Sequence, residues 1–204
     1  MIVIIDYGMG NLRSVKKAIE FLGKDAKVTD NSKFIKVAKK IILPGVGHFG
    51  KAVLELKRRK IFDVLIKKIT EGIPFLGICL GMQIVFEKSQ EAKNTKGLGL
   101  IKGEVRKFNL KNLIVPHMGW NNVSVIKKTK KTKIFEGIKN NSFFYFAHSY
   151  YCLPEEKDVI VAITDYKIKF CSVINKKNIW AVQFHPEKSQ NVGLKLLKNF
   201  IDLC

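Results

Sequence analysis

The sequence has no long apolar run. Lysines interrupt every apolar stretch before it reaches the roughly 18 residues that a membrane-spanning helix needs. Residues 1–6 are apolar up to an aspartate and show neither the basic leader nor the small-residue cleavage site of a signal peptide. We therefore interpret this segment as a strand and expect a cytoplasmic protein without membrane contact.

Cysteine is also scarce. The four cysteines, Cys79, Cys152, Cys171 and Cys204, form no C-x-x-C pair. This spacing argues against a structural zinc site and against a disulfide framework. Three of them are expected to be ordinary core or terminal residues, and only Cys79 lies in a motif that suggests chemistry.

Acidic charge is low, with 17 aspartates and glutamates against 37 lysines and arginines, and the net charge is +20. Such a charge suggests nucleic-acid binding, and residues 127–133 are the densest basic segment. Only four of the basic residues are arginine, however, whereas nucleic-acid recognition favours the planar guanidinium. We interpret the lysines as a solvated coat, part of which is also suited to steering an acidic protein partner, and expect no nucleic-acid partner.

The first half of the chain alternates short apolar runs with helical patterns, which is typical of β-α-β units and predicts a parallel sheet. With 204 residues, 47% of them hydrophobic, the chain can bury one sizeable core, and we expect a single domain over residues 1–204. The expected strands are residues 2–6, 26–29, 41–44 and 74–78, and the expected helices are residues 11–22, 51–70 and a helix that begins over residues 82–87.

From about residue 103 the pattern changes to strands with little helix between them. This change predicts antiparallel or mixed strands at the edge of the sheet, so the expected fold is α/β, an open, mostly parallel sheet flanked by helices. Ser189 is the expected N-cap of a closing amphipathic helix. The expected strands are residues 113–115, 123–126, 143–148, 159–164, 170–174 and 179–184.

The segment Gly-Ile-Cys-Leu-Gly, residues 77–81, is the most informative in the chain. Glycines two residues before and two after Cys79 allow a sharp, strained turn from a strand into a helix, the geometry of a nucleophile elbow. A cysteine at a helix N-terminus has its thiolate favoured by the helix dipole. The pattern is also compatible with a tight turn around a buried cysteine.

A nucleophilic cysteine needs a histidine to carry a proton and a third group to orient that histidine. His185 ends an apolar run and is followed by Pro186 and Glu187. Side chains two residues apart in an extended segment point the same way, and the proline stiffens the link, so Glu187 is placed beside the His185 ring. The alternative is a pair with only surface roles at a strand exit.

Three further histidines follow strand signals. His48 lies in residues 44–50, which contain a proline and three glycines, so that backbone N–H groups can approach a substrate closely. The lysine and hydroxyl residue of a phosphate-binding P-loop are missing, and an oxyanion-binding loop is the better interpretation. His117 and His148 are interpreted as structural histidines.

Together, residues 6–11, 44–50, 77–83, 116–121 and 183–189 resemble the class I (triad-type) glutamine amidotransferases, and the match covers essentially the whole chain. The sequence His-Met-Gly-Trp-Asn is similar to that of the glutaminase subunit of imidazole glycerol phosphate synthase, and it separates this subunit from the amidotransferases of purine, anthranilate and pyridoxal phosphate synthesis. The resemblance implies hydrolysis of glutamine to glutamate and ammonia without a metal or organic cofactor.

The resemblance also implies roles for individual residues. Cys79 matches the nucleophile, His185 the general base and acid, and Glu187 the residue that orients His185. Gly47 and Leu80 match the positions whose backbone N–H groups lie near the oxyanion. The positions that match glutamine-binding residues are Gln83, Ser149 and Tyr150. The positions that match the contact with a (β/α)8 barrel cyclase subunit, which forms a heterodimer with this subunit and receives the ammonia, are Asn11, Trp120, Tyr145 and Lys188.

The acceptor of the ammonia binds on the other chain, so this sequence does not identify it. Histidine biosynthesis is the preferred pathway, but relatives of this subunit serve synthase-like partners in surface-sugar pathways with the same glutaminase motifs. Two hypotheses of other classes remain. One is a cysteine hydrolase of peptides or esters with the same elbow, and the other is a lysine-rich nucleic-acid-binding module.

Overall fold

The computed structural model of the chain describes residues 1–109, 111, 114–126 and 130–204, the last range without the side chains of residues 130 and 131. A parallel sheet forms the centre of the fold, as the alternating pattern of the first half predicts. In spatial order its strands are β2 (Ala26–Thr29), β1 (Ile2–Ile5), β3 (Lys40–Gly45), β4 (Phe75–Cys79) and β12 (Ile179–Val182).

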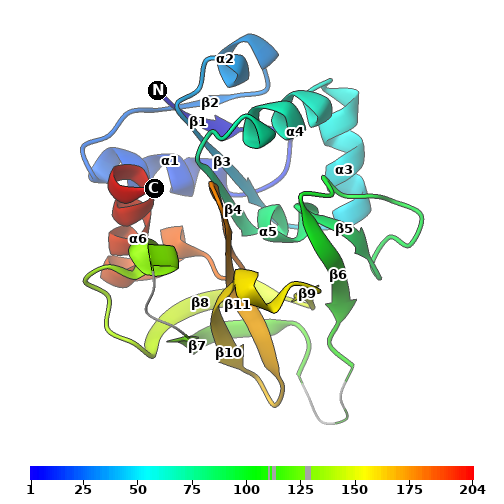
Figure 1. The fold of residues 1–204 in the computed structure, drawn as a ribbon, viewed down its shortest axis with the longest axis vertical. Helices are drawn as coiled ribbons and strands as arrows, with labels where there is room; N and C mark the ends of the chain where they lie inside the picture. The colour runs from blue at the N-terminus through cyan, green and yellow to red at the C-terminus, as the bar shows by residue number, and fades with distance from the viewer. Residues whose placement is uncertain (110, 112–113, 127–129) are drawn as a thin grey trace.

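Helices cover both faces of this sheet (Figure 1). One face carries α1 (Leu12–Phe21) and α6 (Gln190–Leu203), which lie side by side although they are far apart in the sequence. The opposite face carries α2 (Ser32–Lys36), α3 (Phe49–Arg58) and α4 (Phe62–Thr70). In the described part of the chain, no helix is both long and apolar enough to cross a membrane.

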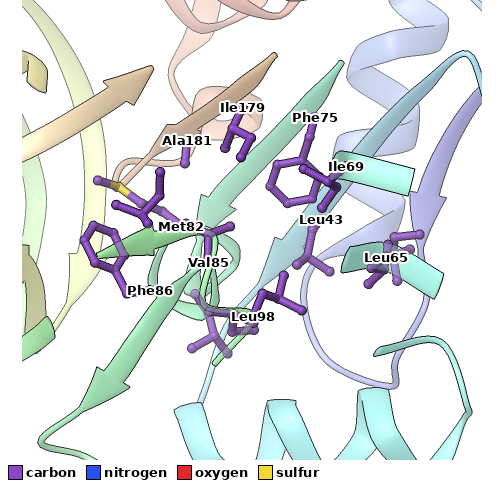
Figure 2. Close-up of a cluster of buried hydrophobic side chains, with 14 of the residues drawn as sticks. Leu43, Leu65, Ile69, Phe75, Met82, Val85, Phe86, Leu98, Ile179 and Ala181 are labelled. Atoms are coloured by element: carbon purple, nitrogen blue, oxygen red, sulfur yellow. The ribbon is translucent and has the colours of Figure 1, made fainter. Parts of the chain in front are cut away.

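The strands contribute side chains to two separate hydrophobic cores, because successive side chains of a strand point to opposite faces of the sheet. In β1, Val3 and Ile5 belong to the core under α3 and α4, whereas Ile2 and Ile4 belong to the core under α1 and α6. Figure 2 shows part of the first core, where Phe75 packs near Ile69. Because these strands run parallel, their carboxyl ends lie together along one end of the sheet. That end carries the site described below.

The second half extends the sheet with antiparallel strands, as expected. From β12 outward the order continues with β11 (Lys169–Lys176), β10 (Ile160–Asp165), β7 (His117–Val125) and β8 (Ser142–His148). Among the described residues, three more strands branch from this path, and they are β5 (Phe86–Ser89), β6 (Ile101–Lys107) and β9 (Tyr150–Pro154). The 3-10 helices are η1 (Lys130–Phe135), η2 (Lys157–Val159) and η3 (Pro186–Lys188). The predicted fold class is confirmed.

Several predicted boundaries are wrong. The expected helix over residues 51–70 is two helices, because Lys60 adopts a positive φ of 57° and breaks the chain direction between α3 and α4. The expected helix over residues 82–87 is the short helix α5 (Leu80–Ile84), and β5 begins only two residues after its end. Strands β6 and β9 and helix α2 were not predicted.

Two predictions fall partly on residues outside the described ranges. Of the expected strand at 113–115, Leu113 lies outside the described residues, and Ile114 and Val115 belong to no strand. The strand expected at 123–126 begins earlier, at His117. Of the basic segment 127–133, residues 127–129 also lie outside the described part of the chain.

Candidate active site

The predicted nucleophile sits at the junction of β4 and α5. Cys79 is the last residue of β4 and has φ 54° and ψ −106°, a left-handed conformation that is unfavourable for a side chain with a Cβ. Both flanking glycines are needed for space. A Cβ on Gly77 would lie 2.7 Å from the carbonyl oxygen of Gly81, and a Cβ on Gly81 would overlap the carbonyl oxygen of Leu43. The turn therefore combines a strained cysteine with two close backbone approaches.

Amide and carbonyl groups surround the buried Cys79 thiol. The Sγ atom lies 3.9 Å from the carbonyl oxygen of Ala147, and Gln183 Nε2 donates to it over 3.7 Å. Gln83 Nε2 in turn donates to Gln183 Oε1 over 3.3 Å and to the Tyr150 carbonyl over 3.1 Å. Gln83 of α5 thus supports Gln183, the side chain just after β12 that donates to the sulfur.

The predicted base and its orienting carboxylate are paired. His185 Nδ1 lies 2.8 Å from Glu187 Oε1, and both side chains are only 2% exposed. Glu187 stands at the centre of η3, a helix that Pro186 begins immediately after His185. The short link suggested by the sequence is therefore what brings the two side chains together.

The charges around His185 favour its protonated form. Burial disfavours the imidazolium, but the negative charges of Cys79 and Glu187 outweigh burial and raise the pKa of His185 to about 10. His185 Nε2 has no nitrogen or oxygen partner among the described groups, and Cys79 raises the pKa of the imidazole through charge and hydrogen bonding. This ring nitrogen is free to exchange a proton with a group placed at the thiol.

Ser189 holds this segment by an unexpected route. It precedes α6, as predicted, but its hydroxyl caps no helix N–H. Instead Ser189 Oγ donates to the His185 carbonyl over 2.6 Å and accepts from the Tyr145 N–H over 3.0 Å. The hydroxyl is fully buried between β8 and η3, and its two bonds fix His185 against the sheet.

A cavity of about 220 Å³ opens above the thiol. It brings together all five of the residues predicted to bind the oxyanion or glutamine, namely Gly47, Leu80, Gln83, Ser149 and Tyr150. Gly47 has φ 112°, a conformation that favours glycine, and Leu80 is the first residue of α5. The predicted set is therefore contiguous, although its members come from three parts of the chain.

Glu91 also lines this cavity, and the sequence interpretation missed it. Its Oε2 accepts from the Phe49 N–H over 2.6 Å, and its negative charge adds to burial in raising the pKa of Tyr150. No local pattern pointed to Glu91, because a helix and not strand β5 was expected before it. Glu91 therefore adds a carboxylate to the lining of the cavity.

The remaining histidines lie outside the predicted triad. His48 was expected in an oxyanion-binding loop, but its Nδ1 accepts from the N–H groups of Gly50 and Lys51 and caps α3. His117 and His148 are buried and hydrogen-bonded to each other, which agrees with their interpretation as structural histidines.

Three of the four predicted partner-contact residues lie together. Trp120 and Tyr145 are register partners on β7 and β8 with ring centroids 6.1 Å apart, and Lys188 Nζ lies 5.6 Å from the centre of the Tyr145 ring. Met118 and Phe143 share this sheet face and are 64% and 58% exposed. The fourth, Asn11, makes its side-chain hydrogen bond with α1, which it caps through the Ser14 N–H.

Comparison with known proteins identifies the family. The family model for glutamine amidotransferase class I matches residues 3–203. A HisH subunit of imidazole glycerol phosphate synthase from Methanocaldococcus jannaschii is 53% identical over 100% of both chains. One from Pyrococcus furiosus is 50% identical over 98% of this chain and 97% of its own. The chain belongs to the class I glutamine amidotransferases, among the HisH subunits of imidazole glycerol phosphate synthase.

Solved structures agree with the class I glutamine amidotransferase fold. A crystal structure of a glutamine amidotransferase superimposes with a TM-score of 0.78 at 19% identity and covers 98% of this chain and 97% of that one. The PurLQS structure from Thermotoga maritima gives a TM-score of 0.76 at 20% identity with the same coverage. At these identities the likeness concerns the fold alone.

Proposed function

We propose that this chain, as one glutaminase domain, hydrolyses glutamine through Cys79, His185 and Glu187 and passes the ammonia to a partner subunit. The observation that carries the proposal is the geometry of the site. A strained elbow presents Cys79 below a cavity, and the buried His185–Glu187 pair is electrostatically coupled to that cysteine. The cavity of about 220 Å³ suits a small substrate such as glutamine better than a peptide, which would need an extended groove.

The cavity provides a complementary charge for the α-ammonium group of glutamine and polar groups for the rest of the molecule. The Glu91 carboxylate suits the α-ammonium group, and the backbone at Ser149 and Tyr150 offers polar groups to the rest of the amino-acid end. Gln83 adds a side-chain amide close to the thiol. Such opposed groups orient the substrate so that its side-chain amide reaches Cys79.

The reaction then proceeds in two steps. The Cys79 thiolate attacks the amide carbon of glutamine, and the backbone N–H groups of Gly47 and Leu80 stabilise the oxyanion. The His185 imidazolium protonates the departing nitrogen, so the C–N bond breaks and ammonia and a thioester result. His185 next accepts a proton from water, whose oxygen attacks the thioester and releases glutamate and the thiolate. Glu187 keeps the imidazole in orientation throughout.

We infer that the partner docks on the exposed face of β7 and β8 and that it is the (β/α)8 barrel subunit of the synthase. The relatives are named as subunits of imidazole glycerol phosphate synthase, which supports a partner and a role in histidine biosynthesis. The face displays Trp120, Met118 and Phe143, large apolar side chains that are unusual on a free surface. It adjoins the site, because Tyr145 on this strand pair accepts the His185 N–H at 2.8 Å.

The test is glutamate release from glutamine by this protein together with the synthase barrel and its phosphoribulosyl ligand. We expect strong stimulation by barrel and ligand, and no release by the Cys79→Ala variant. Release that is unaffected by Cys79→Ala would refute the triad. Cys79-dependent release that the barrel does not stimulate would refute the histidine pathway and indicate a different synthase.

A further inference from the structure

A histidine pair beside the cavity has no part in the reaction steps above. His117 on β7 and His148 at the end of β8 face each other across the antiparallel strands. His117 Nδ1 lies 3.0 Å from His148 Nε2, and both residues are buried. Buried polar groups are costly unless each one has a partner, so the contacts of the other two ring nitrogens decide what this pair can do.

The neighbouring groups determine which ring nitrogens of His117 and His148 carry a proton. His148 Nδ1 lies 2.8 Å from the Tyr150 carbonyl, which can only accept, so Nδ1 donates and Nε2 must accept. His117 Nδ1 is therefore the donor between the two rings, and His117 Nε2 accepts from Asn121 Nδ2 at 3.3 Å. Burial lowers the pKa of His117 to about 4 and that of His148 to about 3, so both rings are neutral near neutral pH.

This directional chain of hydrogen bonds ends in the glutamine cavity. The Tyr150 carbonyl accepts from His148 and also from Gln83 Nε2 at 3.1 Å. Gln83 contacts Gln183, whose Nε2 donates to Cys79 Sγ. The histidine pair and the Gln83 amide therefore share one acceptor, and a displacement of the Tyr150 carbonyl disturbs both.

We propose that His117 is a positioning residue for glutamine: it holds His148 in the orientation that fixes the Tyr150 carbonyl and the Gln83 amide at the cavity. The inference rests on the proposed glutaminase function. It adds to that function a residue that touches neither the substrate nor the reacting atoms. The effect should appear in glutamine binding, because the relay reaches the cavity wall and leaves the His185–Glu187 pair untouched.

The packing of His117 permits variants that separate hydrogen bonding from shape. Its ring stacks on Tyr166 with centroids 3.9 Å apart and on Phe146 with centroids 4.8 Å apart. His117→Phe keeps an aromatic ring in this stack but removes the donor to His148. His117→Asn loses the stack but places an amide N–H close to the position of Nδ1. Tyr166→Phe is the matched control, because it removes only the hydroxyl that donates to the Ile114 carbonyl.

The experiment measures KM and kcat for glutamine with each variant in complex with the synthase barrel and its ligand. We expect His117→Phe to raise KM about tenfold, the equivalent of one lost hydrogen bond, while kcat changes by less than about threefold. His117→Asn should recover part of that KM despite the lost stacking. Tyr166→Phe should match the wild type. Glutamine affinity measured by calorimetry in the Cys79→Ala background should follow the same order.

Other outcomes overturn the inference. An unchanged KM in His117→Phe shows that the relay does not position the substrate. A larger loss in His117→Asn than in His117→Phe, accompanied by a lower Tm, shows that His117 matters only for packing. A wild-type complex that releases no glutamate refutes the glutaminase proposal instead, and the calorimetric affinities then decide the positioning role separately.

Discussion

Cys79 occupies a backbone conformation that costs on the order of 1–3 kcal/mol and persists only because the surrounding structure imposes it. Alanine has a Cβ of the same kind, so Cys79→Ala should retain the elbow and lose only the thiol. We expect glutamate release to fall at least about a thousandfold, with the free energy of unfolding changed by less than about 2 kcal/mol. Coupled-enzyme assays and urea unfolding measure the two quantities. Residual release above about one per cent would contradict the assignment of the nucleophile.

The pKa of His185 should depend on its two charged neighbours, Cys79 and Glu187. Cys79 is the larger cause that raises this pKa, and Glu187 follows. Cys79→Ala should therefore lower the His185 pKa more than Glu187→Gln does, as an NMR titration of the imidazole can show. Glu187→Gln should also slow glutamate release less than Cys79→Ala, because it weakens the orientation and the charge of the base but leaves the nucleophile in place. A His185 pKa that Cys79→Ala leaves unchanged would contradict the coupling.

The raised pKa has a consequence for stability. Since the folded-state pKa lies above the ordinary value of 6.5, the stabilisation by the imidazolium is complete below pH 6.5 and is lost as the pH rises through about 10. The wild type should therefore lose stability over this interval relative to His185→Asn. An equal difference in the free energy of unfolding between the two proteins at both ends of the interval would contradict the pKa shift.

At the scale of the element, the β4–α5 turn depends on glycines, which have no side chain to collide with the neighbouring backbone. Gly81→Ala would force its Cβ onto the Leu43 carbonyl of the neighbouring strand β3, and we expect a loss of about 3 kcal/mol or more in the free energy of unfolding. Gly23→Asn is the control. No atom lies within 4 Å of its added Cβ, and asparagine tolerates the local φ of 72°. Denaturant unfolding should separate the two variants, and an equal loss in both would contradict the packing argument.

The link between β8 and η3 depends on one hydroxyl. Ser189→Ala leaves the Tyr145 N–H without its side-chain acceptor and frees the His185 carbonyl. We expect a loss of about 1–3 kcal/mol in stability and a lower kcat for glutamine hydrolysis. Ser142→Ala, which removes a hydroxyl bonded to the Lys139 carbonyl in an exposed turn, should cost less than about 1 kcal/mol. If the two alanine variants unfold alike, Ser189 does not fix this segment.

Elements were predictable where their signals are local. The elbow and the His185–Glu187 pair depend on spacings of two residues, which the sequence displays directly. Strand β6 was missed because charged residues and Gly103 interrupt its apolar pattern, although burial alternates along it. Gly103 is there because its Cα meets β9, where a Cβ would collide with Leu153. That close approach comes from a register that no local pattern reveals.

At the scale of the whole molecule, the α/β class and the mixed sheet followed from the order of apolar runs, because strands buried on both faces must be covered by helices. The contents of the cavity were predictable only through the family resemblance, since its wall joins five separate segments of the chain. Neither Glu91 nor the pairing of His117 with His148 has a local signal. The pairing follows from the β7–β8 register.

The proposed partner surface gives the prediction that concerns the whole molecule. Trp120 is 46% exposed and lies next to Tyr145, whose backbone holds His185, so docking at this face reaches the site over a short path. Large aromatic side chains dominate binding energy at interfaces, and we expect Trp120→Ala to weaken binding of the synthase barrel by about 2 kcal/mol, or roughly thirtyfold in Kd. Leu54→Ala is the matched control, because Leu54 is 63% exposed but lies on α3. Calorimetric titration of both variants with the barrel measures the difference. If Trp120→Ala binds as tightly as Leu54→Ala, the barrel docks on another face, and ammonia must leave the site by a route that does not pass β7 and β8.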